Sequence, residues 1–255
     1  GGLGTDTVDY SGAGGALTVN LTTGAVTGSG NDTLSSIDHV IGGASGDTFT
    51  GSAGAETLDG GSGADSFVGS AGNDSLIGGL GTDTIDYSGA GGALNVNLTT
   101  GAVTGSGNDT LSGFDHVIGG AGNDTFTSGG ANETFDGGVG NDSFIGGTGN
   151  DSFIGGAGAN VADYSAAGAI TVNLTTGAVT GSGNDTLSSI DHVIGGTSGD
   201  TFTGSAGAET LDGAGGADSF VGSAGNDSLI GGLGTDTVDY SGAGGALTVN
   251  LTTGA

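Results

Sequence analysis

The chain has 255 residues, of which 64 are glycine and 28 are aspartate or glutamate, and it contains no lysine, arginine, proline, cysteine, methionine or tryptophan. With no basic residue to contact a phosphate, the net charge of −28 excludes binding to nucleic acid and to anionic lipid. No apolar run approaches the roughly 20 residues that a membrane helix needs, and the absence of cysteine excludes a disulfide framework.

The charge also limits how this chain can fold. Its carboxylates have no cationic side chain to pair with apart from three histidines, and compaction brings like charges together at a cost in free energy. Either the chain stays extended or a cation from solution neutralises it. Clustered carboxylates and backbone carbonyls are hard oxygen ligands, which suit Ca²⁺ far better than Zn²⁺ or Cu²⁺. We therefore predict that the chain folds with several bound Ca²⁺ ions.

From its first residue the chain consists of long tandem repeats. The string GGLGTDTVDYS begins at Gly1, related copies begin at Gly78 and Gly155, and an identical copy begins at Gly231. This spacing predicts repeat units at 1–77, 78–154 and 155–230, with a partial fourth unit at 231–255. Both ends of the chain fall inside a repeat, so we expect it to be a segment of a longer array.

A shorter repeat of nine residues lies inside each unit. Five consecutive nonapeptides occupy 42–86, 119–163 and 195–239, separated by spacers of about 32 residues such as 10–41. The first five positions are mostly glycine and small residues, which allow a tight turn. Position six is acidic in nearly every copy, and positions seven to nine read as a short strand with one inward apolar side chain.

One nonapeptide is thus half a coil, and stacked coils bury a thin apolar core between two parallel sheets. The inward position holds Phe49, Leu58, Phe67, Leu76 and Ile85 in the first block, Phe126, Phe135, Phe144, Phe153 and Ala162 in the second, and Phe202, Leu211, Phe220, Leu229 and Val238 in the third. Apolar and polar residues also alternate over 16–21 in the first spacer, and Leu34, Ile37 and Val40 follow at intervals of three. We expect the spacers to form wider coils of the same solenoid and not flexible linkers.

The nonapeptide, GGxGxDxUx with a large apolar residue at U, resembles the RTX (repeats-in-toxin) calcium-binding family. The spacer string VNLTTGAVTGSGNDTLSSIDHVIGG is similar to spacers of large bacterial RTX surface proteins. The resemblance covers the whole chain and implies an all-β fold, a right-handed parallel β-roll or β-helix solenoid. It also implies that Ca²⁺ binds between coils, where position-six carboxylates of nonapeptides n and n+2 stack and turn carbonyls complete the oxygen shell.

Carried over to this sequence, the resemblance implies a set of calcium ligands on two edges of each block. In the first block one edge has Asp47, Asp65 and Asp83, and the other has Glu56 and Asp74. In the second block the edges have Asp124 and Asp142, and Glu133 and Asp151. In the third block they have Asp200, Asp218 and Asp236, and Glu209 and Asp227. Asp6 ends a preceding block, and Asp32, Asp109 and Asp185 in the spacers are weaker candidates.

Some positions depart from this pattern. Asn160 replaces the acid in its nonapeptide, so a site there should be weak or empty. Glu56, Glu133 and Glu209 are one methylene longer than aspartate. A second group of acids at position nine is expected to end strands and face water: Asp59, Asp86, Asp136, Asp163, Asp212 and Asp239.

Nothing in the sequence completes a catalytic site. His39, His116 and His192 each follow an aspartate, which could suggest catalysis or Zn²⁺, but no HExxH string, GxSxG string or cysteine accompanies them. A structural role at the surface is the favoured reading. We therefore expect no enzyme activity from this chain.

The expected function is a calcium-binding structural array of a secreted bacterial protein: a stiff extracellular filament, stalk or surface-layer component. The resemblance implies type I secretion and folding in calcium-rich medium. Two alternatives remain open: the stalk of an adhesin, and the carrier module of a secreted enzyme whose catalytic domain lies outside this chain. The expected partners are copies of the chain itself, stacked end to end or covalently continued, and a cell surface or matrix. The expected axial repeat is about 20 Å for each unit if it forms about four coils.

Overall fold

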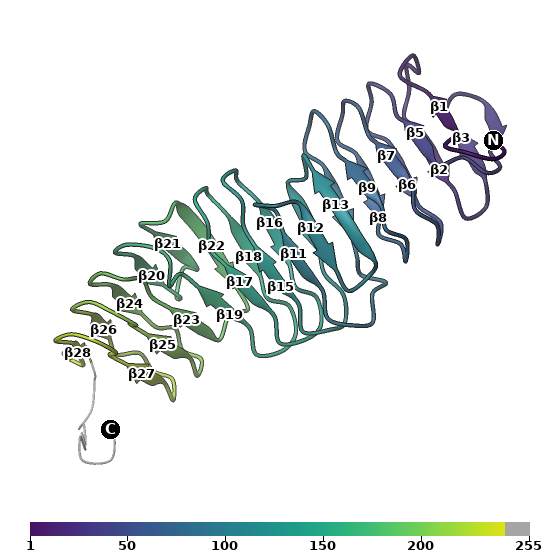
Figure 1. The fold of residues 1–255 in the computed structure, drawn as a ribbon. Helices are drawn as coiled ribbons and strands as arrows, with labels where there is room; N and C mark the ends of the chain where they lie inside the picture. Colours follow the sequence, from purple (N-terminus) through teal and green to yellow (C-terminus); the bar gives the residue numbers. More distant parts are fainter. Residues whose placement is uncertain (243–255) are drawn as a thin grey trace.

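The computed structural model describes residues 1–242. The partial unit that the sequence predicts at 231–255 is therefore described only as far as residue 242. The described residues form 28 short strands, arranged in two sheets that face each other along a single row of coils (Figure 1). The N-terminal strand β1 and the last described strand, β28, lie at opposite ends of this row (Figure 1).

The first sheet, called sheet A, has 13 strands. In spatial order they are β1 (Thr7–Asp9), β5 (His39–Ile41), β7 (Thr57–Asp59), β9 (Ser75–Ile77), β13 (Asn108–Ser112), β12 (Ala102–Thr104), β11 (Asn95–Asn97), β15 (Thr125–Thr127), β17 (Ser143–Ile145), β19 (Val161–Asp163), β23 (His192–Ile194), β25 (Thr210–Asp212) and β27 (Ser228–Ile230).

The second sheet, called sheet B, has 15 strands. In spatial order they are β28 (Thr237–Asp239), β26 (Ser219–Val221), β24 (Thr201–Thr203), β20 (Thr171–Asn173), β21 (Ala178–Thr180), β22 (Asn184–Ser188), β18 (Ser152–Ile154), β16 (Thr134–Asp136), β14 (His116–Ile118), β10 (Thr84–Asp86), β8 (Ser66–Val68), β6 (Thr48–Thr50), β2 (Thr18–Asn20), β3 (Ala25–Thr27) and β4 (Asn31–Thr33).

Within a nonapeptide block, consecutive strands alternate between the two sheets, and each strand pairs in parallel with the strand two nonapeptides later. Phe49 is thus in register with Phe67 in sheet B, and Leu58 with Leu76 in sheet A. One nonapeptide is half a coil and two make a full coil. This confirms the fold class expected from the sequence, an all-β parallel β-roll solenoid.

The core is the column of inward side chains between the sheets. The middle residue of each three-residue strand is buried in the first two blocks, as the sequence predicts, and stacked rings fill much of the second block. Phe144 lies between Phe126 and Phe153, with ring centroids 5.3 Å and 5.4 Å away. At the end of the described residues Leu229 is half-buried and Val238 is exposed.

The spacers are ordered, but their form differs from the expected wider coil. Each spacer folds as a three-stranded antiparallel meander that lies in one sheet: β2–β3–β4 and β20–β21–β22 in sheet B, and β11–β12–β13 in sheet A. The chain reverses at glycines with positive φ, such as Gly101 (φ 74°) and Gly105 (φ 111°). Side chains other than glycine rarely adopt this conformation, so these glycines allow the reversals that a wider coil would not need.

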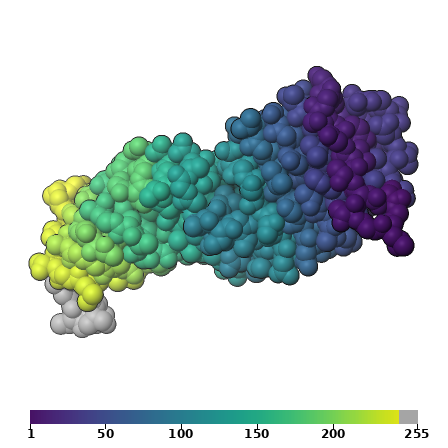
Figure 2. Space-filling model, turned by 45° about the horizontal axis from the view of Figure 1, so that its top comes forward, coloured from purple at the N-terminus to yellow at the C-terminus, as the bar shows by residue number. Residues whose placement is uncertain are grey.

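The meander runs backwards along the solenoid. After β10 the chain advances to β11, which pairs with β15 of the next block, and then returns to β13, which pairs with β9 of the previous block. The second and third spacers therefore join two blocks by parallel strand pairing on both of their sides, whereas the first spacer pairs with a block through β2 and ends at the sheet edge with β4. Figure 2 shows the result as one elongated body in which the chain runs from one end to the other.

The spacers alternate between the sheets because each unit makes an odd number of crossings between them. In each unit the chain enters a sheet seven times: in five nonapeptide strands, in one meander and in the strand that begins with histidine. Seven is odd, so the next unit starts in the other sheet. The same residue therefore lies in opposite sheets in neighbouring units, as His39 in β5 and His116 in β14 do. The structural period is two sequence units, and along sheet A it spans nine strand steps, from β5 to β23.

No helix occurs among residues 1–242, so this part of the chain has no helical segment that could cross a membrane.

The packing makes a direct prediction for the aromatic column. Replacing Phe144 by alanine removes a fully buried ring that stacks on both sides, so it should lower the free energy of unfolding by about 3–5 kcal/mol. Val139→Ala, at a side chain that is 59% exposed in a neighbouring turn, should change it by less than about 0.5 kcal/mol. Urea unfolding at a fixed excess of Ca²⁺ measures both variants, and equal effects would contradict this packing.

Candidate metal centres

Two rows of acidic side chains follow the solenoid, one beside each sheet. Most of these residues lie directly before a strand, and most of the aspartates accept a hydrogen bond from the backbone N–H of the corresponding residue one coil earlier, whereas Glu56, Glu133 and Glu209 accept only from residues of their own turn. The Asp47 N–H donates to Asp65 Oδ1 at 2.6 Å, and the Asp65 N–H donates to Asp83 Oδ1 at 2.8 Å. The stacking of nonapeptides n and n+2 is therefore present in the fold.

Row A, beside sheet A, consists of Asp6, Asp38, Glu56, Asp74, Asp109, Asp124, Asp142, Asn160, Asp191, Glu209 and Asp227. Row B, beside sheet B, consists of Asp47, Asp65, Asp83, Asp115, Glu133, Asp151, Asp185, Asp200, Asp218 and Asp236.

The backbone explains why an acid occupies position six. The backbone carbonyl of the position-six residue accepts a hydrogen bond from the first strand residue of the next coil. The Ser66 N–H donates to the Asp47 carbonyl in this way, at 2.8 Å. The N–H of the position-six residue precedes the strand, and a carboxylate of the next coil accepts that N–H. A buried donor without a partner costs free energy, so the carboxylate row completes the hydrogen bonding of the turn.

Most of these acids are inside the molecule. The buried members of the predicted set are Asp47, Glu56, Asp65, Asp74, Asp83, Asp109, Asp124, Glu133, Asp142, Asp151, Asp185, Asp200, Glu209 and Asp218. Asp6, Asp227 and Asp236 are half-buried. Asp32 is exposed, accepts a hydrogen bond from the Tyr10 hydroxyl at 3.1 Å, and lies outside both rows. Asp109 and Asp185, in the other two spacers, continue rows A and B.

The second oxygen of each carboxylate divides the rows into two kinds of position. Where serine occurs early in the nonapeptide, its hydroxyl binds that oxygen: Ser70 Oγ donates to Asp74 Oδ2 at 2.6 Å, and Ser52 binds Glu56 in the same way. At other positions a backbone N–H binds this oxygen, as the Gly43 N–H does to Asp47 Oδ2 at 2.7 Å, or the oxygen has no partner. The acids with such a buried, unpartnered Oδ2 are Asp65, Asp83, Asp142, Asp185 and Asp218.

Burial also changes the acidity of these groups. Loss of solvent raises the pKa of Asp65 to about 6. The hydrogen bond from the Asp47 N–H lowers this pKa, and the negative charges of Asp83 and Asp47 raise it further. Asp142 follows the same pattern, and its pKa is raised to about 6. Burial likewise raises the pKa of Asp83 and of Asp218. In the metal-free fold these groups therefore resist ionisation.

The space around these oxygens fits a hard cation. A Cβ atom added to Gly60 would collide with Asp65 Oδ2 and with the Gly78 carbonyl oxygen, so the glycine lets these two oxygen atoms approach the same point of the turn. Within residues 1–242 no three His, Cys, Asp or Glu side chains converge on one point. At this turn a carboxylate oxygen and a backbone carbonyl oxygen thus lie together, and both are oxygen ligands of the kind that Ca²⁺ takes.

Three acids that the sequence analysis paired only with histidine also belong to the rows. Asp38, Asp115 and Asp191 accept the N–H groups of Asp6, Asp83 and Asn160 at 2.9–3.0 Å. An available signal was missed: each of them directly precedes a short strand, β5, β14 or β23, as every position-six acid does.

Comparison with known families agrees with this geometry. The profile of the RTX calcium-binding nonapeptide repeat matches residues 34–67, 59–90, 102–126, 111–144, 127–162, 187–220 and 212–243, which together make up more than half of the chain. The chain belongs to this family. No curated protein matches it as a whole.

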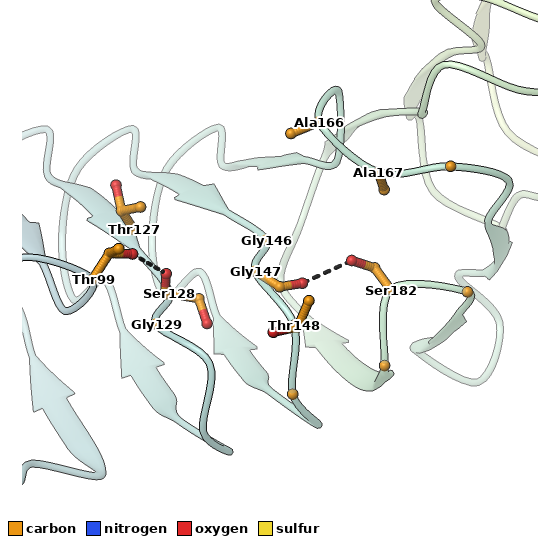
Figure 3. A pocket seen from close by; sticks show the side chains of 14 residues that line it. Thr99, Thr127, Ser128, Gly129, Gly146, Gly147, Thr148, Ala166, Ala167 and Ser182 are labelled. Carbon is orange, nitrogen blue, oxygen red and sulfur yellow. Dashed lines mark hydrogen bonds between the residues drawn. The ribbon is translucent and has the colours of Figure 1, made fainter.

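The module is accordingly a calcium-binding repeat region of the kind found in secreted bacterial proteins, and the RTX repeat itself is structural and not catalytic. The position-nine acids form local turns, as in the 2.7 Å bond from the Ser88 N–H to Asp86 Oδ1. His116 and His192 are half-buried, and Nε2 of each lacks a hydrogen-bond partner. A groove of about 750 Å³ near the middle of the solenoid is lined by Gly, Ala, Ser and Thr, without an acid or a histidine (Figure 3).

Position within a row should decide how many ions a carboxylate holds. Asp65 lies between Asp47 and Asp83, whereas the other neighbour of Asp47 is the Leu17 backbone, whose N–H donates to it at 2.8 Å. Asp65→Asn should therefore reduce bound Ca²⁺ by more than Asp47→Asn does, and Asp86→Asn should leave it unchanged. Equilibrium dialysis with radioactive calcium measures this. Equal losses for the two row variants would show that ions do not bind between stacked acids.

The raised pKa values predict that acid partly replaces calcium. Asp65 and Asp142 have pKa values of about 6 in the metal-free fold and about 3.8 when unfolded, so between pH 4 and 6 the folded state binds more protons than the unfolded state. Their contribution to stability is thus present at low pH and is lost as the pH rises through 6. In chelator, circular dichroism should show more β structure at pH 5 than at pH 7.5, and the opposite trend would contradict the assignment.

Proposed function

We propose that this chain is a stiff, calcium-dependent structural segment of an extracellular bacterial protein, acting as part of a filament, stalk or surface layer. The feature that carries the proposal is the continuity of the solenoid through the spacers. A chain of blocks joined by flexible linkers would bend at each spacer. Here the second and third meanders pair in parallel with the blocks on both of their sides, as β13 does with β9 and β11 with β15.

Side-chain contacts reinforce these junctions. The Ser182 hydroxyl of the third spacer donates to the Gly147 carbonyl at 2.7 Å, and the Thr99 hydroxyl of the second spacer donates to the Ser128 carbonyl at 3.0 Å (Figure 3). Both contacts connect a spacer to a turn of the second block, on the wall of the groove described above. The spacers are therefore suited to transmit bending forces from block to block.

Calcium-controlled folding supports the extracellular part of the proposal. Buried carboxylates with raised pKa values oppose folding when no cation is present. Extracellular calcium modules bind their ions at about 10⁻⁴–10⁻³ M. The chain would remain unfolded in calcium-poor cytoplasm, as type I secretion requires, and would fold after export.

We further propose that copies of this solenoid stack end to end. The acidic flanks disfavour side-by-side packing, whereas the strand-pairing direction lies along the axis. Because neighbouring units place their spacers in opposite sheets, the axial period of such a filament is two units. Nine strand steps of about 4.8 Å give a period of about 43 Å, in place of the expected 20 Å for one unit.

Small-angle X-ray scattering of this chain tests the stiffness. In millimolar Ca²⁺ we expect a single rod about 60 Å long, from the 13 strands of sheet A spaced by about 4.8 Å. In chelator at neutral pH the radius of gyration should rise to about 55 Å, the value for an unfolded chain of this length. A calcium-bound profile of several compact bodies joined by hinges would contradict the proposal.

A further inference from the structure

The return turn of each spacer places two oxygen atoms beside the end of a nonapeptide block. In the second spacer this turn contains Gly113 and Asp115. Asp115 Oδ2 accepts the Asp83 N–H at 2.9 Å, and the N–H groups of Asp115 and His116 both donate to the Asp83 carbonyl at 3.0 Å. The spacer acid thus takes the place that the next nonapeptide acid has inside a block.

A backbone carbonyl oxygen also lies at this junction where a nonapeptide carbonyl lies inside a block. Inside a block, the carbonyl of the next position-one glycine, Gly78, and Asp65 Oδ2 approach Gly60 so closely that a Cβ atom there would collide with both. At the junction, the carbonyl of Gly113, which has φ 71°, and Asp83 Oδ2 approach Gly78 in the same way. The spacer sequence lacks the nonapeptide pattern, but its turn supplies a carbonyl at the same place.

The second oxygen of the Asp83 carboxylate lacks a partner at this place. Asp83 is fully buried, and its Oδ2 has no hydrogen bond. The Gly113 carbonyl, which also approaches Gly78, is an acceptor and cannot donate a proton to it, and the negative charge of Asp115 acts on Asp83 as well. A buried acceptor beside other acceptors is unfavourable unless a proton or a cation lies between them.

The third unit provides a natural comparison. Asn160 occupies the position that Asp83 has in the second unit, and its N–H donates to Asp191 Oδ2 at 3.0 Å. The side-chain Nδ2 of Asn160 donates to the Ser189 carbonyl at 3.0 Å, and this carbonyl corresponds to that of Gly113. The amide therefore supplies the positive end of a dipole where the second unit has only oxygen atoms.

We propose that Ca²⁺ binds at the junction between block and spacer, held by the carboxylates of Asp83 and Asp115 and the carbonyl of Gly113, and that in the third unit the Asn160 amide replaces the ion. The first unit has the same set in Asp6, Asp38 and the Ser36 carbonyl, although there Asp6 Oδ2 also accepts the Gly2 N–H at 2.7 Å. The inference rests on the calcium binding of the family and not on the proposed stalk role. It adds ligands from a segment outside the nonapeptide repeat.

The location gives these ions a distinct effect. An ion at the junction connects the last coil of a block to the strand that follows the meander, β14 in the second unit. Calcium would thus connect the block and the spacer strand at Asp83 in the second unit. At Asn160 in the third unit, a hydrogen bond that needs no calcium makes the connection. The array therefore contains calcium-dependent and calcium-independent junctions between units.

Two equivalent substitutions in the full-length chain test this proposal. Asp115→Asn should reduce bound Ca²⁺ by one ion per chain in equilibrium dialysis at saturating calcium, because it removes a ligand from an ion site. Asp191→Asn, at the same position one unit later, should leave the number unchanged. Circular dichroism in calcium checks that each variant is folded. Equal losses in the two variants, whether none or one, would overturn the proposal.

A gain of binding provides the second arm and does not depend on the folding of Asp115→Asn. Asn160→Asp should add at least one bound ion, and Asp191→Asn in that background should remove an ion that it does not remove from the original chain. Hydrogen exchange at β23 should then become calcium-dependent, as we expect at β14 in the original chain. No increase in bound calcium for Asn160→Asp would overturn the role given to the amide.

Discussion

The structure depends on burying carboxylates that have no cationic side chain to neutralise them. Fourteen of the acids assigned from sequence are buried, and the chain contains no lysine or arginine. Burial of an unpaired charge costs several kcal/mol per group, even after relaxation of its surroundings. The apolar column between the sheets is only one side chain wide, so it offers little to offset this cost. We therefore expect a cation between the coils to stabilise the folded state at neutral pH.

The same acids organise the backbone. Most aspartates of the rows accept an N–H from the coil before, as Asp65 and Asp83 do, so such an acid acts as a turn residue, a link between coils and a candidate metal ligand at once. The rows are not uniform along their length. A serine hydroxyl donates a hydrogen bond to the second carboxylate oxygen at positions such as Asp74. Asp65 and Asp142 each have one carboxylate oxygen without a hydrogen-bond partner. We expect the latter positions to depend on calcium most strongly.

Sequence periodicity was sufficient to predict the blocks. Position-six acids and inward apolar residues recur every nine residues, and the stacking of nonapeptides n and n+2 follows from two half-coils per turn. The spacer was harder to predict, because its alternating residues are equally compatible with a wide coil and with a meander. The decisive residues are the glycines at the two reversals, such as Gly101 and Gly105.

The spacer acids that precede the histidines could not be assigned as ligands from their spacing in the sequence. Asp115 meets Asp83 across 32 residues of sequence, and only the backward path of the meander brings the two together. The alternation of spacers between sheets has a similar origin. It follows from the parity of the crossings in each unit, which can be counted only once the meander is known to remain within one sheet.

The central claim is that calcium is required for folding because the buried carboxylates have no other counter-charge. A calcium titration followed by far-ultraviolet circular dichroism at pH 7.5 and low ionic strength tests it most directly, with Mg²⁺ at equal ionic strength as the control. We expect a disordered spectrum in chelator and a cooperative change to β structure at about 10⁻⁴–10⁻³ M Ca²⁺, with little change in Mg²⁺. A β spectrum that chelator leaves unchanged would contradict the account.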